Sequence, residues 1–275
     1  MTSPRPSARA GGSGCRDGGE PTGRVKRLGL HPGRHDHLVA LAGNPNTGKS
    51  TVFNALTGLR QHTGNWPGKT VARAEGGFAY GGRRFKLVDL PGTYSLLATS
   101  PDEEVARSFL LFGRPDVTVV VVDAARLERN LSLVLQVFEI TDSVVVCLNL
   151  VDEARRHGFW VDDRRLSRDL GVPVVPTVAR RGEGIERLVE EIHRVASGTR
   201  RPHPSRVGDL GPELEAVLGD LVPRLEARFP ELDNARWIAL RLLDGDAQVT
   251  EAVASGTFDG NLARGEAASG IGEVS

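Results

Sequence analysis

The sequence has few cysteines, few aromatic residues and no excess of charge of either sign. Only two of its 275 residues are cysteines; Cys15 lies in a glycine-rich stretch and Cys147 in an apolar one, so we do not expect a disulfide between them. Lys and Arg number 35, and Asp and Glu also number 35. Because this balance leaves no net field to attract nucleic acid or an anionic membrane, it argues against a primary nucleic-acid role.

Long hydrophobic runs are also missing. The longest apolar segments, 117–122 and 144–148, have the length of buried strands. They are far shorter than the roughly 20 residues that a membrane-spanning helix requires. The N-terminal residues Met-Thr-Ser-Pro-Arg-Pro lack the apolar stretch of a secretory signal. We therefore expect a cytoplasmic protein with no transmembrane segment in this chain, with a peripheral position at the inner face of the cell membrane, through a partner, as the alternative.

The residues that are present divide the chain into four zones. Residues 1–36 are rich in Gly, Pro, Ser and Arg, and we expect a disordered tail there because few apolar groups offset the entropy of ordering. In 37–198, strand-like runs alternate with amphipathic helical patterns, which predicts an α/β domain with a largely parallel sheet. A proline-bearing basic linker opens a small helical domain over 199–254, and 255–275 is predicted to be a flexible tail.

The element pattern is specific enough to place individual strands and helices. Gly81-Gly82 predicts a two-residue hairpin, so one strand should be antiparallel. Leucines at helical spacing from Leu210 to Leu225, and Trp237 behind an Asp233 or Asn234 cap, predict the helical domain. The predicted strands are 37–42, 71–80, 83–88, 116–122, 143–149 and 172–176, and the predicted helices lie near 49–58, 102–112, 127–140, 162–170 and 184–197.

A phosphate-binding loop follows the first predicted strand. Residues 43–50 read Gly-Asn-Pro-Asn-Thr-Gly-Lys-Ser and lead into a helical stretch, which is the strand-loop-helix setting of this motif. Its glycines let backbone N–H groups and the helix N-terminus approach an anion. Lys49 can reach the β- and γ-phosphates, and the Ser50 hydroxyl can ligate Mg²⁺. The residues predicted to bind a nucleoside triphosphate here are Gly43, Asn44, Pro45, Asn46, Thr47, Gly48, Lys49, Ser50 and Thr51.

Three further motifs each follow a predicted strand. In Asp89-Leu90-Pro91-Gly92, the aspartate can hold Mg²⁺ and the Gly92 N–H can meet a γ-phosphate. In Asn149-Leu150-Val151-Asp152, the aspartate can accept hydrogen bonds from both N1–H and the exocyclic amine of guanine, two donors that adenine does not present together, while Asn149 braces the phosphate loop and touches N7. The backbone of Thr177-Val178-Ala179 can meet the guanine O6. Because open α/β sheets bind ligands along this edge, the order of the motifs predicts a guanine nucleotide site.

The segment before the hairpin reads as a switch. Thr70 is placed to offer Mg²⁺ a hydroxyl in the triphosphate state and to release it after hydrolysis. Together with the Gly-Asn-Trp-Pro-Gly loop at 64–68 and the motifs at 43–50, 89–96 and 149–152, it resembles the GTPase domain of the ferrous iron transport protein B (FeoB) family. Residues 235–245 resemble the helical spacer domain of that family. The resemblance spans roughly 37 to 250 and implies a Ras-like P-loop GTPase fold: a mostly parallel six-stranded sheet with one antiparallel strand, plus a small α-helical domain.

The resemblance also implies a mechanism. Members hydrolyse GTP to GDP and phosphate slowly, regulate ferrous iron transport across a membrane, and use the helical domain to damp GDP release. It implies that Asn46 ligates K⁺ together with carbonyls of Gly64 and Trp66, and that K⁺ stimulates hydrolysis. Thr93 stands where small regulatory GTPases carry a water-orienting glutamine. The residues expected to act in catalysis are Asn46, Lys49, Thr70 and Gly92, and those expected to hold Mg²⁺ are Ser50, Thr70 and Asp89.

Partners and alternatives remain open. The resemblance implies a membrane-embedded iron transporter segment or a separate polypeptide of that kind, because nothing after Gly245 could conduct Fe²⁺, and a homo-oligomer is also open. The competing interpretations are a ribosome- or RNA-associated GTPase and a nucleotide-binding adaptor with negligible turnover. The first of these usually carries a basic RNA-binding module, whereas 205–254 is acidic to neutral and helical.

Two charged features have a simpler interpretation. His31, His35, Asp36 and His37 are closely spaced, but no second ligand cluster would close a metal site around them, so we expect a solvated linker. The arginine pairs 83–84, 155–156 and 180–181 are expected to be solvated loop charges, with a basic face near lipid as the alternative.

Overall fold

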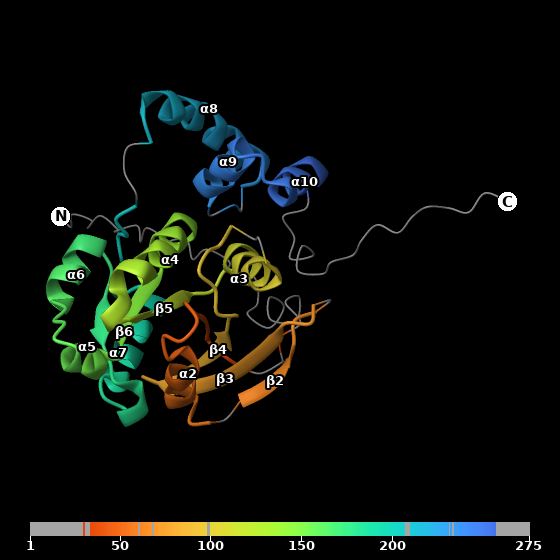
Figure 1. The fold of residues 1–275 in the computed structure, drawn as a ribbon. Helices are drawn as coiled ribbons and strands as arrows, with labels where there is room; N and C mark the ends of the chain where they lie inside the picture. The colour runs from red at the N-terminus through yellow and green to blue at the C-terminus, as the bar shows by residue number, and fades with distance from the viewer. Residues whose placement is uncertain are drawn as a thin grey trace, which may run out of the picture.

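A seven-stranded sheet forms the centre of the protein (Figure 1). The computed structural model describes residues 30, 34–59, 61–67, 69–97, 100–206, 210–230, 232 and 234–256. Cys15, His31, Gly68, Asp233 and the predicted tails over 1–29 and 257–275 lie outside these residues. The strand order is β2-β3-β4-β1-β5-β6-β7. Its strands are β1 (His37–Gly43), β2 (Gln61–Asn65), β3 (Ala72–Tyr80), β4 (Arg83–Asp89), β5 (Val117–Asp123), β6 (Val144–Asn149) and β7 (Val174–Pro176).

The strand directions agree with the prediction, but the number of strands does not. The pairs β1–β4, β1–β5, β5–β6 and β6–β7 are parallel, whereas β3 is antiparallel to both β2 and β4. Gly81 and Gly82 both have positive φ, 56° and 74°, as the predicted two-residue hairpin requires. The seventh strand is β2, whose five residues are all exposed. Since it has no buried face, it shows no apolar alternation that would reveal it in the sequence.

The helices connect these strands and then form a group of their own. Helix α5 is not among the predicted helices, and α10 lies almost entirely within the predicted helical domain over 199–254, where no separate helix had been placed. Asn234 occupies the N-cap position of α9 without a side-chain capping bond. The helices are α2 (Lys49–Thr57), α3 (Pro101–Phe112), α4 (Leu127–Ile140), α5 (Val151–Arg156), α6 (Asp163–Leu170), α7 (Ile185–Ala196), α8 (Pro212–Arg228), α9 (Ala235–Leu243) and α10 (Ala247–Ser255), with short 3₁₀ turns at Ala124–Arg126 and Ala179–Arg181.

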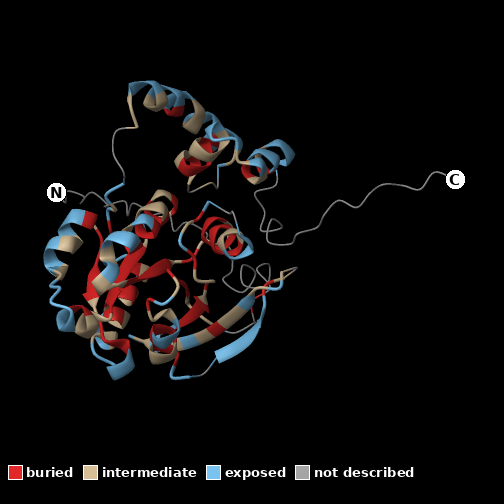
Figure 2. Ribbon diagram, in the orientation of Figure 1, coloured by how far each residue is buried: buried red, intermediate tan, exposed pale blue. Residues whose placement is uncertain are grey.

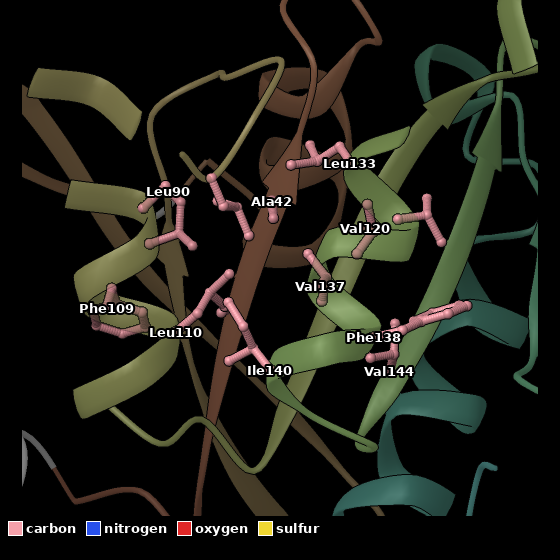
Figure 3. Close-up of a cluster of buried hydrophobic side chains, with 14 of the residues drawn as sticks. Ala42, Leu90, Phe109, Leu110, Val120, Leu133, Val137, Phe138, Ile140 and Val144 are labelled. Carbon is pink, nitrogen blue, oxygen red and sulfur yellow. The ribbon is translucent and has the colours of Figure 1, made fainter. Parts of the chain in front are cut away.

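The core has one apolar cluster on each face of the sheet. Along β1, Val39 and Leu41 pack with residues of α2 and α7, while Leu38 and Ala40 belong to the cluster with α3 and α4. Figure 3 shows the cluster with α3 and α4, in which Phe109 of α3 and Phe138 of α4 pack on the same face of the sheet. Residues 117–122 of β5 are all buried because helices cover both faces (Figure 2). This layering leaves the carboxyl edge of the parallel strands as the place for a ligand.

The helical group α8–α10 lies beyond α3 and α4 (Figure 1). Its buried Trp237 and Ile238 belong to the same apolar cluster as α3 and α4. Arg107 of α3 is 3% exposed; its guanidinium donates to Asp246 Oδ2 at 2.5 Å and to Gln248 Oε1. The same guanidinium lies 5.9 Å from the Trp237 ring centroid. Apolar packing and one buried arginine therefore join the helical group to the sheet domain.

The start of β1 corrects one expectation. Asp36 Oδ2 accepts a hydrogen bond from the Arg84 N–H at 2.7 Å, and His37 stacks on Phe85 with ring centroids 5.2 Å apart. Asp36 and His37 therefore lie at the amino-terminal end of β1 and contact β4, so they are not a solvated linker. Among the described residues, no group of three or more His, Cys, Asp or Glu side chains could hold a metal ion. Within the same residues, no helix combines the length and the apolar character needed to cross a bilayer.

Candidate nucleotide-binding site

The phosphate-binding loop leaves β1 at Gly43 and enters α2 at Lys49. Gly48 is the N-cap residue of α2 and is left-handed, with φ 80°. Asn46 is also left-handed, with φ 67°, which is uncommon for a residue that carries a side chain. Asn46 is exposed and makes no hydrogen bond to the described residues, whereas both polar atoms of the buried Asn44 side chain lack a partner there. The loop therefore turns its backbone sharply at the end of β1 and leaves one amide free toward solvent.

Asn149 fastens this loop to two other strand ends. Its Nδ2 donates to the Thr47 carbonyl at 3.0 Å. Its Oδ1 accepts from the Thr177 hydroxyl and from the Ala179 N–H, each at 3.1 Å. All three bonds are buried, so each is favoured by the low local dielectric. The predicted brace thus exists, and it also joins the loop after β7.

Lys49 and Asp89 meet at the ends of α2 and β4. The Lys49 Nζ lies 2.5 Å from Asp89 Oδ1, and both side chains are largely buried. Burial raises the pKa of Asp89 above its ordinary value, and the neighbouring Lys49 charge opposes that rise. A desolvated carboxylate of this kind is stabilised by a cation. The pair therefore offers a cation to phosphate and a carboxylate to a metal ion.

The segment after Asp89 packs against the phosphate loop. The Leu90 N–H donates to Leu41 O at 2.9 Å, and a Cβ added to Gly92 would lie 3.5 Å from the Pro45 Cα. The Thr93 hydroxyl donates to the Ser95 carbonyl at 2.6 Å and is buried. The Thr93 hydroxyl is therefore hydrogen-bonded within its own loop, whereas Gly92 lies beside the phosphate loop.

Asp152 lies in the first turn of α5 and faces Arg180 and Arg181, one of the arginine pairs expected to be solvated loop charges. Its Oδ2 accepts from Arg180 Nη2 and lies 3.5 Å from Arg181 Nη2. Its buried Oδ1 has no hydrogen-bond partner. Burial alone would raise the pKa of Asp152, but the hydrogen bond and charge of Arg180, together with Arg181, hold that pKa below its usual value. Arg180 is thus a half-exposed charge that is also paired with Asp152, and only its position directly after Thr177-Val178-Ala179 hinted at this pairing.

The backbone after β7 is less free than predicted. The Ala179 N–H donates to Asn149 Oδ1 at 3.1 Å, and the Val178 N–H donates to Glu183 O at 3.0 Å. Both N–H groups are therefore already used within the protein and are not free to bind the guanine O6. The side chain of Thr177, which had not been assigned a role, is the group that orients Asn149.

The predicted switch residues pair with other parts of the structure. Gly64 is in the exposed edge strand β2, paired with Arg73, and the Trp66 side chain packs edge-on against Phe109 of α3 at 5.4 Å between centroids. The Trp66 carbonyl accepts from the Lys69 N–H at 3.0 Å. Gly64, Trp66 and Thr70 make no hydrogen bond to the phosphate loop within the described part of the chain. The structure therefore brings together the nucleotide motifs, but not the switch that the sequence attached to them.

The assembled donor set fits a guanine nucleotide with a divalent cation. The unpartnered Asp152 Oδ1 can accept a hydrogen bond from a base, and Ser50 and Asp89 offer the oxygen ligands that Mg²⁺ prefers. Asn46 offers a free amide oxygen of the type that binds K⁺.

Comparison with known proteins agrees with this geometry. Residues 37–192 match the family described as ferrous iron transport protein B, and residues 211–268 match the FeoB cytosolic helical domain. The chain belongs to the FeoB family. The Fe(2+) transporter FeoB of Salmonella choleraesuis is 42% identical over 234 residues, which cover 82% of this chain and 29% of that protein. The chain therefore spans less than a third of the curated relatives that it matches.

Solved structures of FeoB domains share the fold. The cytosolic domain of T. maritima FeoB in the apo form has a TM-score of 0.72 and 40% identity, covering 81% of this chain and 87% of that one. The GMPPNP form of the same T. maritima domain has a TM-score of 0.68 and 38% identity, covering 80% and 86% of the two chains. These similarities extend over both the FeoB G domain and the helical domain, so the chain shares the fold of both domains with the solved structures.

Proposed function

We propose that this FeoB-family chain binds GTP and GDP with Mg²⁺ and hydrolyses GTP slowly. The observation that carries the proposal is the ion pair between Lys49 Nζ and Asp89 Oδ1, 2.5 Å apart. It lies at the end of a phosphate loop in which Asn46 and Gly48 have left-handed backbone conformations. The GMPPNP form of the T. maritima relative supports guanine-nucleotide binding by this family. In that state Lys49 would turn from Asp89 to the β- and γ-phosphates, and Asp89 would hold Mg²⁺ with Ser50.

Each residue of the proposed site then has a separate role. Gly92 lies beside Pro45, where its N–H can meet a γ-phosphate, and Asn149 keeps the phosphate loop and the base-reading loop in register. Asp152 reads guanine through its free Oδ1. Bound Mg²⁺ would neutralise charge on the phosphates. Thr70 would add its hydroxyl only after the loop at 66–71 has moved, and this movement makes the segment a switch.

Potassium is the proposed activator. Asn46 is exposed, left-handed and free of other hydrogen bonds to the described residues, so its amide oxygen is available to a monovalent cation near the phosphates. Such a cation can do the charge-neutralising work of an arginine finger, an effect of about 10³ to 10⁵ in rate where a finger is used. Carbonyls of Gly64 and Trp66 would complete the site once the switch loop closes.

We further propose that the nucleotide state regulates ferrous iron transport by a membrane-embedded transporter segment, in the same polypeptide or a separate one. The match of 211–268 to the FeoB helical domain favours this interpretation over an RNA-associated GTPase. A switch must bind its partner differently in the two nucleotide states. Equal partner affinity in the GDP and GMPPNP states would favour the adaptor instead.

Titration with fluorescent GDP tests the nucleotide site. Lys49→Ala should weaken binding by at least 10²-fold, because a charge-assisted hydrogen bond and the phosphate countercharge are both lost. The control is Lys69→Ala, which removes a lysine that pairs with Glu104 instead. Unchanged GDP and GTP affinity in Lys49→Ala would reject the phosphate-loop assignment.

Turnover in different salts tests the cation. GTP hydrolysis by the wild type should be faster in KCl than in NaCl at equal ionic strength, and Asn46→Ala should remove the difference without abolishing GDP binding. Equal wild-type rates in the two salts would discard potassium activation and leave the nucleotide site untouched.

A further inference from the structure

Two consecutive aromatic residues stand out from the surface between α5 and α6. Phe159 is 54% exposed, and Trp160, at 80%, is the most exposed large apolar side chain among the described residues. The other two tryptophans, Trp66 and Trp237, are buried at 5% and 6%. Large apolar side chains gain free energy when they leave water, so an adjacent pair held outside the core suggests an interaction site.

The loop that carries the pair has a defined conformation. Gly158 is left-handed, with φ 78°, and its N–H donates to Arg155 O at 3.0 Å. The Phe159 N–H then donates to Ala154 O at 2.9 Å, which ends α5. On the other side, the Asp162 side chain caps α6 by accepting from the Arg165 N–H at 2.9 Å. Because both flanking helix ends are capped, hydrogen bonds fix the backbone on either side of the aromatic pair.

The charge around the pair is positive once ion pairs are set aside. Four of the acidic side chains between 151 and 170 are ion-paired: Asp152 with Arg180, Glu153 with Arg156, Asp163 with Arg187 and Asp169 with Arg165. The fifth, Asp162, accepts the uncharged Arg165 N–H as the α6 cap and keeps its charge. Arg155, Arg164 and Arg168 make no ion pair with the described residues. The Arg155 guanidinium lies 5.3 Å from the Trp160 ring centroid, so positive charge and aromatic surface are contiguous.

We propose that the exposed residues Arg155, Phe159, Trp160, Arg164 and Arg168 of α5, the following loop and α6, which we call the patch, dock on a membrane surface that contains anionic lipid. Tryptophan favours the interfacial layer of a bilayer, where its ring meets lipid and its N–H stays hydrated. Three arginines without an ion-pair partner among the described residues, against the one unpaired carboxylate of Asp162, attract lipid phosphates, each arginine contributing about a fivefold gain in affinity near the surface. The zero net charge of the chain excludes a global attraction, but it does not oppose a local one.

Vesicle binding by the 275-residue chain tests the proposal at low ionic strength. The chain should sediment with vesicles of phosphatidylcholine and phosphatidylglycerol, bind vesicles of phosphatidylcholine alone more weakly, and detach at high salt. Trp160 supplies a direct readout, because the other two tryptophans are already buried. Anionic vesicles should shift the tryptophan emission to shorter wavelength and protect it from acrylamide quenching.

Variants separate the patch from general stickiness. Phe159→Ser with Trp160→Ser should lose at least tenfold in affinity for anionic vesicles, and Arg155→Gln, Arg164→Gln and Arg168→Gln about fivefold each. Two matched controls should bind like the wild type: Val217→Ser with Leu243→Ser, which removes exposed apolar groups elsewhere, and Arg165→Gln, whose arginine is paired with Asp169.

Three outcomes would overturn the proposal. The first is equal binding to neutral and anionic vesicles, and the second is wild-type affinity in the Phe159→Ser, Trp160→Ser double variant. The third is self-association of the wild type without lipid, seen as a mass that rises with concentration in sedimentation and is abolished in the double variant. That result would make the patch an interface between two copies of the chain.

Discussion

At the scale of single residues, Asp152 illustrates how a carboxylate can be prepared for a base. Arg180 occupies Oδ2, whereas Oδ1 is buried without a partner. A buried acceptor left unsatisfied costs about 1–3 kcal/mol, and a ligand that supplies an N–H recovers this free energy. Since the arginines keep the pKa of Asp152 low, the side chain remains ionised at neutral pH and acts only as an acceptor.

The Asp152→Asn variant follows from that argument. An amide presents a donor where guanine also presents one, so GDP affinity should fall by at least 10²-fold, because hydrogen bonds to charged groups contribute about 1.5–3 kcal/mol each. Xanthosine diphosphate, which carries a carbonyl at that position, should be preferred instead. Competition against fluorescent GDP measures both affinities.

The matched control is Asp142→Asn. Asp142 also pairs with an arginine, Arg206, but precedes β6 at the opposite edge of the sheet from Asp152. This control should retain guanine selectivity. If the Asp152→Asn variant still prefers GDP to the xanthine nucleotide, Asp152 does not recognise the base.

At the scale of elements, predictability followed burial. The strands buried on both faces, such as Val117–Asp123, were predicted within one residue because continuous apolar runs mark them. The edge strand Gln61–Asn65 has no apolar side chain and forms through its pairing with β3, so no local pattern could reveal it. The α10 helix buries only Val249 and Ala252, too few residues for a clear helical period.

The site divides in the same way. The phosphate loop, Asp89 and Asn149 were predictable because each stands at a strand end in a motif whose order the fold dictates. Arg180 pairing with Asp152, and Trp66 packing on Phe109, are long-range contacts between side chains with no motif of their own. Such contacts depend on the tertiary arrangement, so sequence spacing alone does not encode them.

Gly48→Ala tests the element that joins loop to helix. Gly48 has φ 80°, and a Cβ there would lie 2.4 Å from Asn149 Nδ2, so the substitution should break the brace as well as strain the backbone. We expect a loss of about 2–4 kcal/mol in the free energy of unfolding, from the strain and the buried amide left unpaired. Urea unfolding without nucleotide measures it.

Gly58→Ala is the control for backbone strain alone. Gly58 ends the same helix with φ 60°, but a Cβ there would meet no atom within 4 Å. The expected loss is about 1 kcal/mol, the usual cost of a left-handed residue with a side chain. Equal losses in the two variants would mean that contact with Asn149 contributes nothing to the stability of the loop.

At the scale of the whole molecule, helix α3 touches both ends of the proposed signal. On one side Phe109 packs against Trp66, and Glu104 pairs with Lys69 at 2.9 Å, both in the predicted switch. On the other side Arg107 enters the helical group. One helix of twelve residues therefore contacts the segment that should respond to nucleotide and the domain that lies beyond it.

The Arg107→Ala variant tests how firmly the two domains are joined. Removing one partner of a buried ion pair typically costs about 3–5 kcal/mol, because the remaining carboxylate loses its countercharge. We expect this loss in urea unfolding, together with faster amide exchange in α9 and α10 and unchanged exchange in β1. The control, Arg224→Ala, removes an arginine paired with Asp220 on the exposed face of α8, where both side chains are over 70% exposed, and should change stability by less than about 0.5 kcal/mol. If Arg107→Ala behaves like Arg224→Ala, apolar packing alone holds the domains together and the polar link from α3 contributes no stability.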